Sequence, residues 1–353
     1  MLVTGGAGFL GASLVRKLVA EGHRVRVLDD GSRGSFRRLS DLEGRYEAVA
    51  GDVRDEPLLR QAATGCEVVY HLAAVNGTRF FYERPELVLD VALRGTLSAV
   101  TAARDAGTRR FLLASSSEVY HDPPVIPTPE DVRMVIPDAY NPRFSYAGGK
   151  IAAELIAIHG LKGTSTDCVI FRPHNVYGPA MGFEHVIPEL VYKLFQAARW
   201  LEEPGRRAGS ELLRQAGSSR PEQWPSLELS IQGSGEETRA FCFVDDAALA
   251  IALLKDRATA FTTYNVGREQ ESSIHDVATK VAAVLGFRAR IVSGPGAAGA
   301  PSRRCPQMDR LRSLGFEART TLDSGLEATV PWYWDAARRG EYPVGDPHDA
   351  ADR

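Results

Sequence analysis

Short apolar runs rich in β-branched residues alternate with longer amphipathic stretches over the first half of the chain. The runs that predict strands lie at residues 2–4, 24–28, 46–50, 68–71, 111–115 and 168–172. Stretches with helical periodicity lie between them, for example at 12–21, 57–63 and 87–106. This spacing is typical of βαβ units, because parallel neighbouring strands need a crossover connection. We therefore expect an α/β fold with a doubly wound parallel sheet over residues 1–178.

Beyond residue 178 the pattern becomes irregular, with frequent glycine and proline and with short, isolated strand signals. This favours a smaller C-terminal α/β lobe over residues 179–345 that binds the substrate, while a segment at about 228–250 returns to the first domain. Residues 198–227 are polar and rich in Arg, Glu, Gly and Ser. They predict a surface insertion, which is either a passive excursion or a lid over the site.

A glycine-rich turn joins the first predicted strand to the first predicted helix. Three glycines have the spacing G-x-x-G-x-x-G, which allows positive φ, lets a pyrophosphate approach bare backbone and packs the helix on the strand. The free N–H groups and the dipole of the helix then hold the phosphates. The turn predicts a Rossmann-type dinucleotide site, because a strand precedes it and a helix follows it. Its cofactor-binding residues are expected to be Gly5, Gly8, Phe9, Leu10 and Gly11.

An acidic residue at the end of the second strand, Asp29, indicates which dinucleotide binds. Its carboxylate can accept hydrogen bonds from the ribose hydroxyls and would repel a 2′-phosphate, which favours NAD over NADP. Nearby Arg33 favours the opposite choice, and a solvated turn aspartate is the alternative reading. Residues after the third and fourth strands complete the expected cofactor contacts: Asp52 and Val53 at the adenine, and Leu72, Ala73 and Ala74 at the phosphate and nicotinamide side.

A serine run at the end of the fifth strand and a Tyr–Lys pair further along the chain suggest proton-transfer chemistry. Tyr146 and Lys150 are four residues apart and share a face of a helix. The lysine ammonium and an oxidised nicotinamide together would pull the tyrosine pKa from about 10 toward neutrality. Tyr146 could then take a hydroxyl proton while a hydride leaves the same carbon, with Ser116 holding the oxygen. A surface pair is the usual reading of this spacing alone, but the glycine turn and the serine run favour catalysis.

With these residues the chain resembles the extended short-chain dehydrogenase/reductase family, which contains nucleotide-sugar epimerases, dehydratases and decarboxylases. Ser116 precedes Tyr120 by four residues as in the family pattern S-[ST]-x-x-V-Y. Residues 172–179 are similar to R-P-x-N-x-Y-G-P, and residues 238–246 to R-x-F-x-[FY]-[VI]-x-D. The resemblance implies tightly held NAD, a nucleotide-sugar substrate, and catalytic roles for Ser116, Tyr146 and Lys150, the last two of which also contact the cofactor.

The resemblance also implies substrate-binding residues. Asn175 would face the substrate phosphates, Arg239 would pair with the diphosphate and Arg304 would bind a second phosphate or the ribose. Further sugar or base contacts are expected at Asn76, Gly77, Ser117, Val186 and Ile187. Two features depart from the family or lack a reason: Ala92 replaces an asparagine that can relay protons, and Gly148 and Gly149 weaken the helix that carries Tyr146.

Family members begin by oxidising a sugar hydroxyl, commonly at C4, and differ in the step that follows. A 4,6-dehydratase uses an Asp–Glu pair, where this chain has Ser117 and Glu118. Residues 116–118 are similar to a decarboxylase of nucleotide-linked hexuronic acid, and an epimerase needs only the Ser, Tyr and Lys. Glu118 is the residue that distinguishes these three reactions. The alternative is that its carboxylate only makes local hydrogen bonds. We expect an NAD-dependent nucleotide-sugar epimerase, with a decarboxylase or dehydratase as the alternative and a non-catalytic NAD sensor as a remote one.

Composition and charge limit the other partners. The formal net charge of −3 gives no broad basic field for nucleic acid or an anionic membrane. No apolar run approaches the roughly 20 residues that cross a bilayer, and no targeting segment is recognised. The four cysteines lack metal-ligand spacing, so we expect reduced thiols, no metal and a cytoplasmic protein. The helices at 87–106 and 146–159 could pair across a two-fold axis, so we expect a homodimer built on a four-helix bundle.

Overall fold

The computed structural model describes residues 1–202, 220–296 and 302–342. The chain divides into two units, and each is assembled from three separate stretches of sequence. The first unit comprises residues 1–176, 244–269 and 305–319, and the second comprises 177–243, 270–304 and 320–353.

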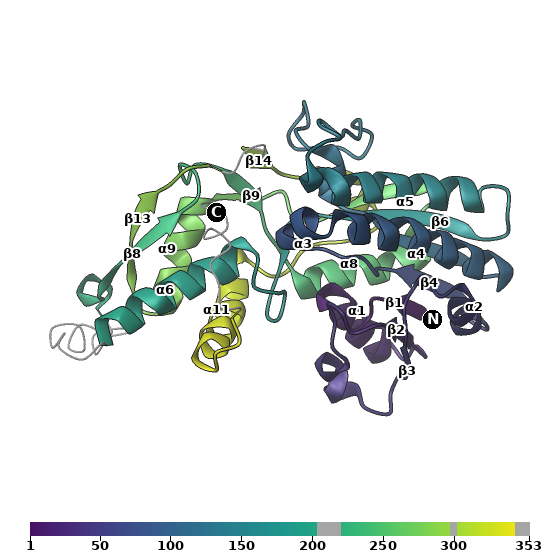
Figure 1. Cartoon of the computed structure of the whole chain (residues 1–353), viewed down its shortest axis with the longest axis horizontal. Helices are drawn as coiled ribbons and strands as arrows, with labels where there is room; N and C mark the ends of the chain where they lie inside the picture. Colours follow the sequence, from purple (N-terminus) through teal and green to yellow (C-terminus); the bar gives the residue numbers. More distant parts are fainter. Residues whose placement is uncertain (203–219, 297–301, 343–353) are drawn as a thin grey trace. The chain divides into compact units, whose positions relative to one another are not determined.

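Seven parallel strands form the central sheet of the first unit in the order β11-β6-β5-β4-β1-β2-β3 (Figure 1). Their bounds are β1 Leu2–Thr4, β2 Arg26–Asp29, β3 Glu47–Ala50, β4 Val68–His71, β5 Arg110–Ala114, β6 Asp167–Pro173 and β11 Thr262–Val266. The strand order reverses between β1 and β4, which is where dinucleotides bind in such sheets. The predicted doubly wound fold is confirmed, and all six predicted strands are present.

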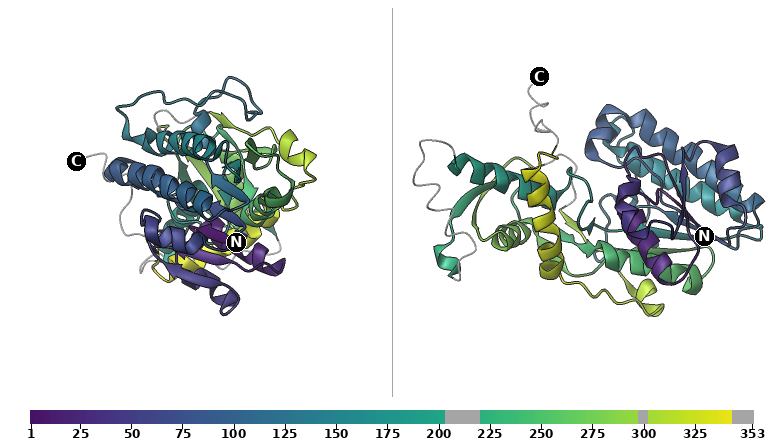
Figure 2. Two further views of the ribbon diagram at one scale, coloured as in Figure 1. Left: turned by 90° about the vertical axis from the view of Figure 1, so that its right-hand side faces the viewer. Right: turned by 90° about the horizontal axis from the view of Figure 1, so that it is seen from below.

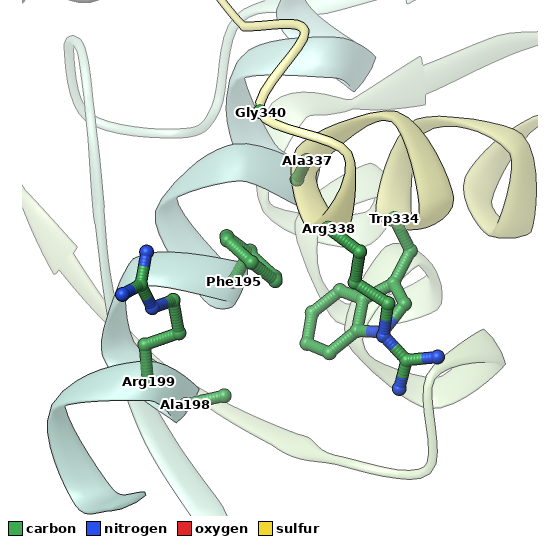
Figure 3. A pocket seen from close by; sticks show the side chains of 7 residues that line it. All are labelled: Phe195, Ala198, Arg199, Trp334, Ala337, Arg338 and Gly340. Atoms are coloured by element: carbon green, nitrogen blue, oxygen red, sulfur yellow. The ribbon is translucent and has the colours of Figure 1, made fainter. Parts of the chain in front are cut away.

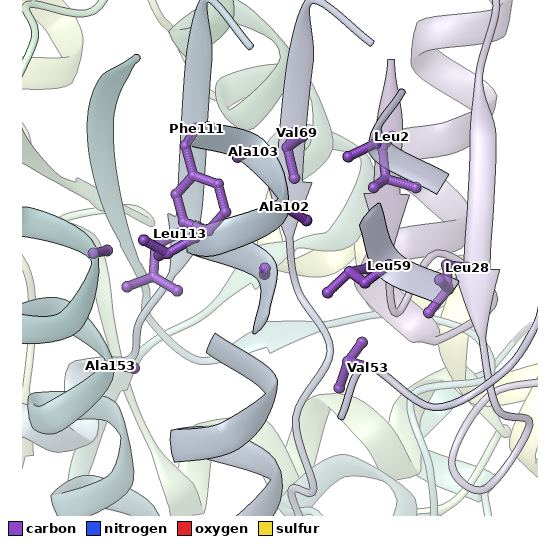
Figure 4. Close-up of a cluster of buried hydrophobic side chains, with 14 of the residues drawn as sticks. Leu2, Leu28, Val53, Leu59, Val69, Ala102, Ala103, Phe111, Leu113 and Ala153 are labelled. Carbon is purple, nitrogen blue, oxygen red and sulfur yellow. The ribbon is translucent and has the colours of Figure 1, made fainter. Parts of the chain in front are cut away.

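Helices cover the sheet of the first unit. Their bounds are α1 Phe9–Ala20, α2 Glu56–Ala63, α3 Thr78–Glu83, α4 Pro85–Asp105, α5 Ser145–Leu161, α8 Val244–Arg257 and α10 Asp309–Ser313, with 3₁₀-helices η1 Phe36–Leu42, η2 Ser117–Tyr120 and η3 Pro142–Phe144. Helix α4 packs between α2 and α5, and α1 packs against α8. The cluster drawn in Figure 4 shows why α2, α4 and α5 stay on the sheet: strand residues such as Val69 and Phe111 bury their side chains against Leu59, Ala102 and Ala153. Each large apolar side chain buried in this way contributes roughly 1.5–3 kcal/mol.

Helices α4 and α5 approach each other closely, and this contact explains one of the glycines that the sequence left unexplained. A Cβ on Gly149 would lie 2.8 Å from the Cβ of Ala92, and a Cβ on Gly160 would lie 2.8 Å from Cγ1 of Val100. Because real Cβ atoms do not approach so closely, glycine is required for this packing. Gly148 is different, since the nearest atom to its Cβ position is 3.8 Å away, on Ile136.

The second unit combines three long helices with small sheets. Its described elements are α6 Val186–Glu202, η4 Pro221–Gln223, β8 Ser226–Ile231, β9 Thr238–Ala240, β10 Cys242–Phe243, β12 Glu271–Ser273, α9 Ile274–Val284, β13 Arg288–Ser293, β14 Arg303–Arg304 and α11 Leu322–Arg338, and β10 pairs with β7, Val176–Tyr177. Strands β8 and β13 pair in parallel, and β12, β9 and β14 form a three-stranded sheet. Helices α6, α9 and α11 pack on one another (Figure 2).

The strands β9, β10, β12 and β14 are short, as the sequence predicts after residue 178, and the structure adds three regular amphipathic helices there, α6, α9 and α11. It also changes the reading of the predicted insertion: residues 198–202 continue α6, residues 220–227 contain η4 and the start of β8, and residues 203–219 lie outside the described residues. Of the segment at 228–250, the part up to Phe243 belongs to the second unit and α8 belongs to the first. Among the described helices, none is both long and apolar enough to span a bilayer.

Candidate active site

The glycine turn after β1 has a backbone that only glycine can form. Gly5 has a φ of 69°, and a Cβ there would lie 2.7 Å from the backbone nitrogen of Ala73 after β4. A Cβ on Gly11 would collide with the carbonyl of Gly5. Gly8 is the N-cap of α1 and brings no side chain to cap it. The first-turn N–H groups of α1, at Phe9, Leu10 and Gly11, therefore suit the phosphates of a dinucleotide.

The carboxylate of Asp29 is built into the same turn. It is buried, and it accepts hydrogen bonds from the backbone nitrogens of Ala7 (3.0 Å) and Gly31 (2.9 Å). Burial raises the pKa of Asp29, and the two backbone hydrogen bonds oppose that rise. Arg38, which no sequence motif marks, donates to the carbonyl of Ala7 at 3.2 Å. The sequence therefore missed a cation that lies beside the turn.

The other expected cofactor residues lie at the ends of β3 and β4. Asp52 forms an ion pair with Arg54, whose hydrogen bond lowers the pKa of Asp52, and Arg54 also binds Asp90 at 2.6 Å. Val53 is buried and would meet a Cβ on Gly95. Leu72, Ala73 and Ala74 follow β4 and are half-buried.

The last residue of β4, His71, which the sequence places with Leu72, Ala73 and Ala74 at the phosphate and nicotinamide side, is buried. Nδ1 of His71 lies 2.8 Å from Oγ1 of Thr4, and Nε2 lies 3.3 Å from Oγ1 of Thr96. Burial lowers the pKa of His71 to about 3, and the charge of Lys150 acts in the same direction. The ring is therefore neutral and ties β1 and α4 to β4.

The three expected catalytic residues come together at the end of β5. Ser116 is the N-cap of η2, where its Oγ accepts from the nitrogen of Glu118 at 3.2 Å, and its hydroxyl acts to lower the pKa of Tyr146. Nζ of Lys150 lies 5.7 Å from the ring centroid of Tyr146. The ring of Phe81 in α3 stacks on the ring of Tyr146, with the two ring centroids 5.1 Å apart. The tyrosine is thus held between a serine hydroxyl, an ammonium and an aromatic ring.

The charges around Tyr146 differ from the simple expectation of a lowered tyrosine pKa. Burial raises the pKa of Tyr146, the carboxylate of Glu118 raises it further, and the hydrogen bond with Ser116 opposes both. Burial lowers the pKa of Lys150 to about 8, while the charge of Glu154 raises it. Nζ of Lys150 donates to the carbonyl of Ala114 at 2.7 Å. The side chains of the protein therefore do not lower the tyrosine pKa by themselves.

Two arginines expected at the substrate phosphates lie next to each other in the second unit. Strands β9 and β14 run parallel with Arg239 and Arg304 in register, so their side chains leave the same face. Nη1 of Arg239 donates to the carbonyls of Thr238 (2.7 Å) and Ser302 (3.3 Å). Like charges at paired positions are unfavourable unless an anion neutralises them. The neighbouring Arg303 pairs with Glu271 through Nη2 and Oε2 at 2.5 Å, and the charge of Arg239 also acts to lower the pKa of Glu271.

The remaining expected substrate residues are divided between the units. Asn76, Gly77, Ser117 and Asn175 belong to the first unit, and Val186 and Ile187 belong to the second. Asn175 adopts a φ of 41°, a conformation that asparagine tolerates better than most residues. Ser117 and Ile187 are buried, with Ile187 only 1% exposed. The side chain of Ile187 therefore packs inside the second unit, and only its backbone is left to reach a sugar or a base.

A separate pocket of about 390 Å³ lies between α6 and α11 in the second unit (Figure 3). Arg199 lies over the ring of Phe195 at 5.9 Å, and Arg338 lies over the ring of Trp334 at 6.0 Å. The pocket contains none of the residues expected at the site. Within the described residues, no group of His, Cys, Asp and Glu side chains could hold a metal ion.

Comparison with known proteins identifies the family. The family model described as "NAD dependent epimerase/dehydratase family" matches residues 1–267. The chain belongs to this family. UDP-glucose 4-epimerase of Mycolicibacterium smegmatis is 31% identical over 344 residues, which cover 94% of this chain and 97% of that protein. UDP-glucuronic acid decarboxylase 1 of Xenopus tropicalis is 30% identical over 338 residues, which cover 94% of this chain and 72% of that protein.

A solved structure agrees with this assignment. A double mutant of the dTDP-glucose 4,6-dehydratase from Streptomyces venezuelae, with NAD bound, superposes with a TM-score of 0.77 at 25% identity and covers 97% of this chain and 98% of that chain. The family member described here is therefore an NAD-dependent enzyme that modifies nucleotide sugars. The bare glycine turn and the buried Asp29 fit that cofactor.

Proposed function

We propose that the protein is an NAD-dependent nucleotide-sugar epimerase that oxidises a sugar hydroxyl, at C4, to a transient ketone and reduces it again with inverted configuration. The assembled set of Ser116, Tyr146 and Lys150 carries this proposal. These three side chains suffice for reversible oxidation of an alcohol when NAD is bound. A protein that only sensed NAD would have no use for a tyrosine held against a serine and a lysine.

Each side chain has a defined task in this chemistry. Bound NAD supplies the hydride acceptor and later returns the hydride. Tyr146 takes the hydroxyl proton as the C–H bond breaks, and returns the proton when the ketone is reduced on its other face. Ser116 holds the reacting oxygen, and the ammonium of Lys150 stabilises the phenolate. Because burial and Glu118 hold the pKa of Tyr146 up, the positive charge of the oxidised nicotinamide has to supply the missing stabilisation of the phenolate.

Residue 117 argues against a 4,6-dehydratase. A dehydratase of this family is expected to place an acid before the glutamate, to protonate the leaving hydroxyl, and this chain has Ser117 there. Ser117 is buried in η2. Elimination of water would therefore lack one of its two carboxylates.

Decarboxylation of a nucleotide-linked hexuronic acid is the second candidate, and Glu118 favours it. The nitrogen of Glu118 is bound by Ser116, and its carboxylate raises the pKa of Tyr146. A carboxylate next to the catalytic base is not needed for epimerisation. The similarity to a UDP-glucuronic acid decarboxylase supports the same candidate.

The paired arginines support a diphosphate as the common part of the substrate. Arg239 and Arg304 present two planar cations side by side, and guanidinium groups bind phosphate oxygens with two parallel hydrogen bonds. We propose that they hold the diphosphate. Within the first unit, we propose that Asp52 and Val53 contact the adenine of NAD.

The reaction is decided by incubating the full chain, with NAD, with a panel of UDP-, GDP-, CDP- and dTDP-linked hexoses and hexuronic acids. Products are read by mass spectrometry and NMR. A new isomer of unchanged mass supports the epimerase. A product lighter by the mass of carbon dioxide would show that the protein is a decarboxylase, and one lighter by the mass of water that it is a dehydratase. If no sugar of the panel is converted, the proposal is contradicted.

Tyr146→Phe is expected to abolish turnover, by roughly 10²–10⁴-fold or more, because the proton acceptor is lost while the ring and its stacking on Phe81 remain. Bound NAD, measured after denaturation, should be unchanged. Tyr140→Phe is the matched control, because Tyr140 is fully exposed in a loop. Near-normal activity of the Tyr146→Phe variant would contradict the proposed mechanism.

We also propose that the protein is a cytoplasmic homodimer in which α4 and α5 of two copies form a four-helix bundle. Leu97 on α4 and Leu155 on α5 are 57% and 48% exposed, which is unusual for large apolar side chains on neighbouring helices. All four cysteines are free and buried, which supports a reducing compartment.

A further inference from the structure

A buried glutamate behind the catalytic side chains joins three elements of the first unit. Glu154 lies one helical turn beyond Lys150 on α5, and its side chain is only 2% exposed. Its Oε1 accepts hydrogen bonds from Oγ of Ser115 (2.5 Å) and Nε of Arg172 (2.8 Å), and its Oε2 accepts from Nη2 of Arg172 (2.7 Å). One carboxylate therefore ties α5 to the ends of β5 and β6.

The arginine partner is itself held on every side. A guanidinium has five N–H donors, and two of those of Arg172 go to Glu154. The other three go to the hydroxyl of Tyr120 (2.8 Å), the carbonyl of Glu130 (2.9 Å) and the sulfur of Met134 (3.3 Å). Burial opposes the charge of Arg172, but Glu154 outweighs it and raises the pKa. Because every N–H donor of Arg172 has a partner, the ion pair with Glu154 is fixed in position.

Three residues in a row, at the end of β5 and just beyond it, face α5. Their three partners lie at intervals of four residues on one face of that helix. The pairs are Ala114 with Lys150, Ser115 with Glu154, and Ser116 with Tyr146. Two of these pairs contain the expected catalytic residues, and the third contains only Ser115 and Glu154.

We propose that Glu154 is a positioning residue, which sets the register of α5 on β5 so that Lys150 and Tyr146 keep their catalytic distance. The inference rests on the proposed role of these two residues in catalysis. The carboxylate of Glu154 is bound to β5 through the Ser115 hydroxyl and to Lys150 and Tyr146 through α5, the helix that carries all three residues. Loss of its charge leaves Arg172 buried without its carboxylate, which forces the arginine and the strand ends to adjust.

The charges that face Lys150 fix the sign of the effect. His71 on β4 is neutral, Ala114 on β5 presents a carbonyl, and Glu154 is the carboxylate whose charge raises the pKa of Lys150 against burial. The adjacent contact from α4 is apolar, since Ala92 meets Gly149, and in η2 the carboxylate of Glu118 acts on Tyr146. Without the charge of Glu154 the pKa of Lys150 falls, so the ammonium is lost at lower pH. The phenolate of Tyr146 then loses its neighbour and forms at higher pH.

Glu154→Gln is the test, and Asp167→Asn is its control. Asp167 pairs with Arg110 at 3.1 Å at the opposite ends of the same two strands, β5 and β6, far along the sheet from Tyr146. The first readout needs no substrate: tyrosinate absorbance is followed against pH in the NAD-loaded protein, with the matching Tyr146→Phe background subtracted because the chain has 11 tyrosines. The second readout is kcat and KM on the substrate found with the sugar panel.

Glu154→Gln should move the Tyr146 titration up by about half a pH unit or more, lower kcat by roughly tenfold or more, and leave the NAD content unchanged. Asp167→Asn should lower the melting temperature without moving the titration. Ser115→Ala, which removes one hydrogen bond to Glu154, should shift the titration in the same direction by less, and it replaces Glu154→Gln if that variant does not fold. An unmoved titration in the Glu154 and Ser115 variants, or an equal shift in Asp167→Asn, would overturn the proposal, whether or not a sugar substrate is turned over.

Discussion

Arg239 and Arg304 are 65 positions apart in the sequence, and strand register places them side by side. Neither arginine is informative alone, since surface arginines usually pair with nearby carboxylates, as Arg303 does with Glu271. In register on β9 and β14 they place two guanidinium groups side by side. We propose that the substrate diphosphate binds there.

Arg239→Gln should raise KM for the nucleotide sugar by about 10–100-fold, which corresponds to the roughly 1.5–3 kcal/mol of a hydrogen bond to a charged group. Arg303→Gln is a matched change on the same strand pair, and it should leave KM within about twofold because its exposed ion pair contributes little. Steady-state kinetics at fixed ionic strength measures both. Equal effects of the two variants would mean that general positive charge, rather than the register pair, attracts the substrate.

At the scale of single residues, the sequence marks those whose chemistry depends on a local motif. The glycines, Asp29 and the Ser–Tyr–Lys set stand at fixed offsets from a strand or from each other, so they can be found without a structure. Glu154 and Arg38 were not found, because each acts through partners that are distant in sequence: Glu154 binds Ser115 and Arg172, which come from two other strands. Ile187 was expected at the sugar or base, and its burial in the first turn of α6 could not be read from the sequence.

At the scale of elements, the pairing of α4 with α5 accounts for sequence features that have no catalytic reading. A Cβ on Gly149 would lie 2.8 Å from the Cβ of Ala92, so the glycine in α5 is explained by its packing on α4. The two helices lie side by side in Figure 1.

Gly149→Ala should lower the free energy of unfolding by up to about 2 kcal/mol, because overpacking costs about 1–3 kcal/mol and better helix propensity returns about 1 kcal/mol. Gly148→Ala should instead raise it by up to about 1 kcal/mol, since its Cβ has room. Chemical denaturation measures both. Combining Gly149→Ala with Ala92→Gly should recover much of the loss, and a stabilising effect of Gly149→Ala alone would contradict the close contact.

The first six strands could be predicted because each is a short apolar run between helical periods, and the structure shifts their bounds by no more than two residues. Strand β11 was missed because its sequence, Thr262–Val266, mixes polar and apolar residues and follows a region of irregular pattern. Its burial comes from pairing with β6 and from contacts that Asn265 makes with Tyr120 and Thr128. Long-range pairing of this kind leaves no periodic signal.

At the scale of the whole molecule, the exposed apolar side chains on α4 and α5 predict a dimer. Leu97→Glu combined with Leu155→Glu should convert it to a monomer, because burying two carboxylates in a helix–helix interface is strongly unfavourable. Analytical ultracentrifugation measures the mass. Val292→Glu, at a partly exposed apolar residue of β13 in the second unit, should leave the dimer intact. A wild-type protein that sediments as a monomer would refute the bundle.

The division of each unit into three stretches has a consequence for how the protein is made. The chain passes from one unit to the other after residues 176, 243, 269, 304 and 319. A ribosome that has finished β6 must therefore add residues 177–243 of the second unit before it supplies β11, the edge strand of the first sheet. At a rate of about 5–20 residues per second this interval lasts on the order of ten seconds. Throughout it, β6 is a nascent sheet edge without its neighbour, and a chaperone that shields such edges has its longest opportunity to act there.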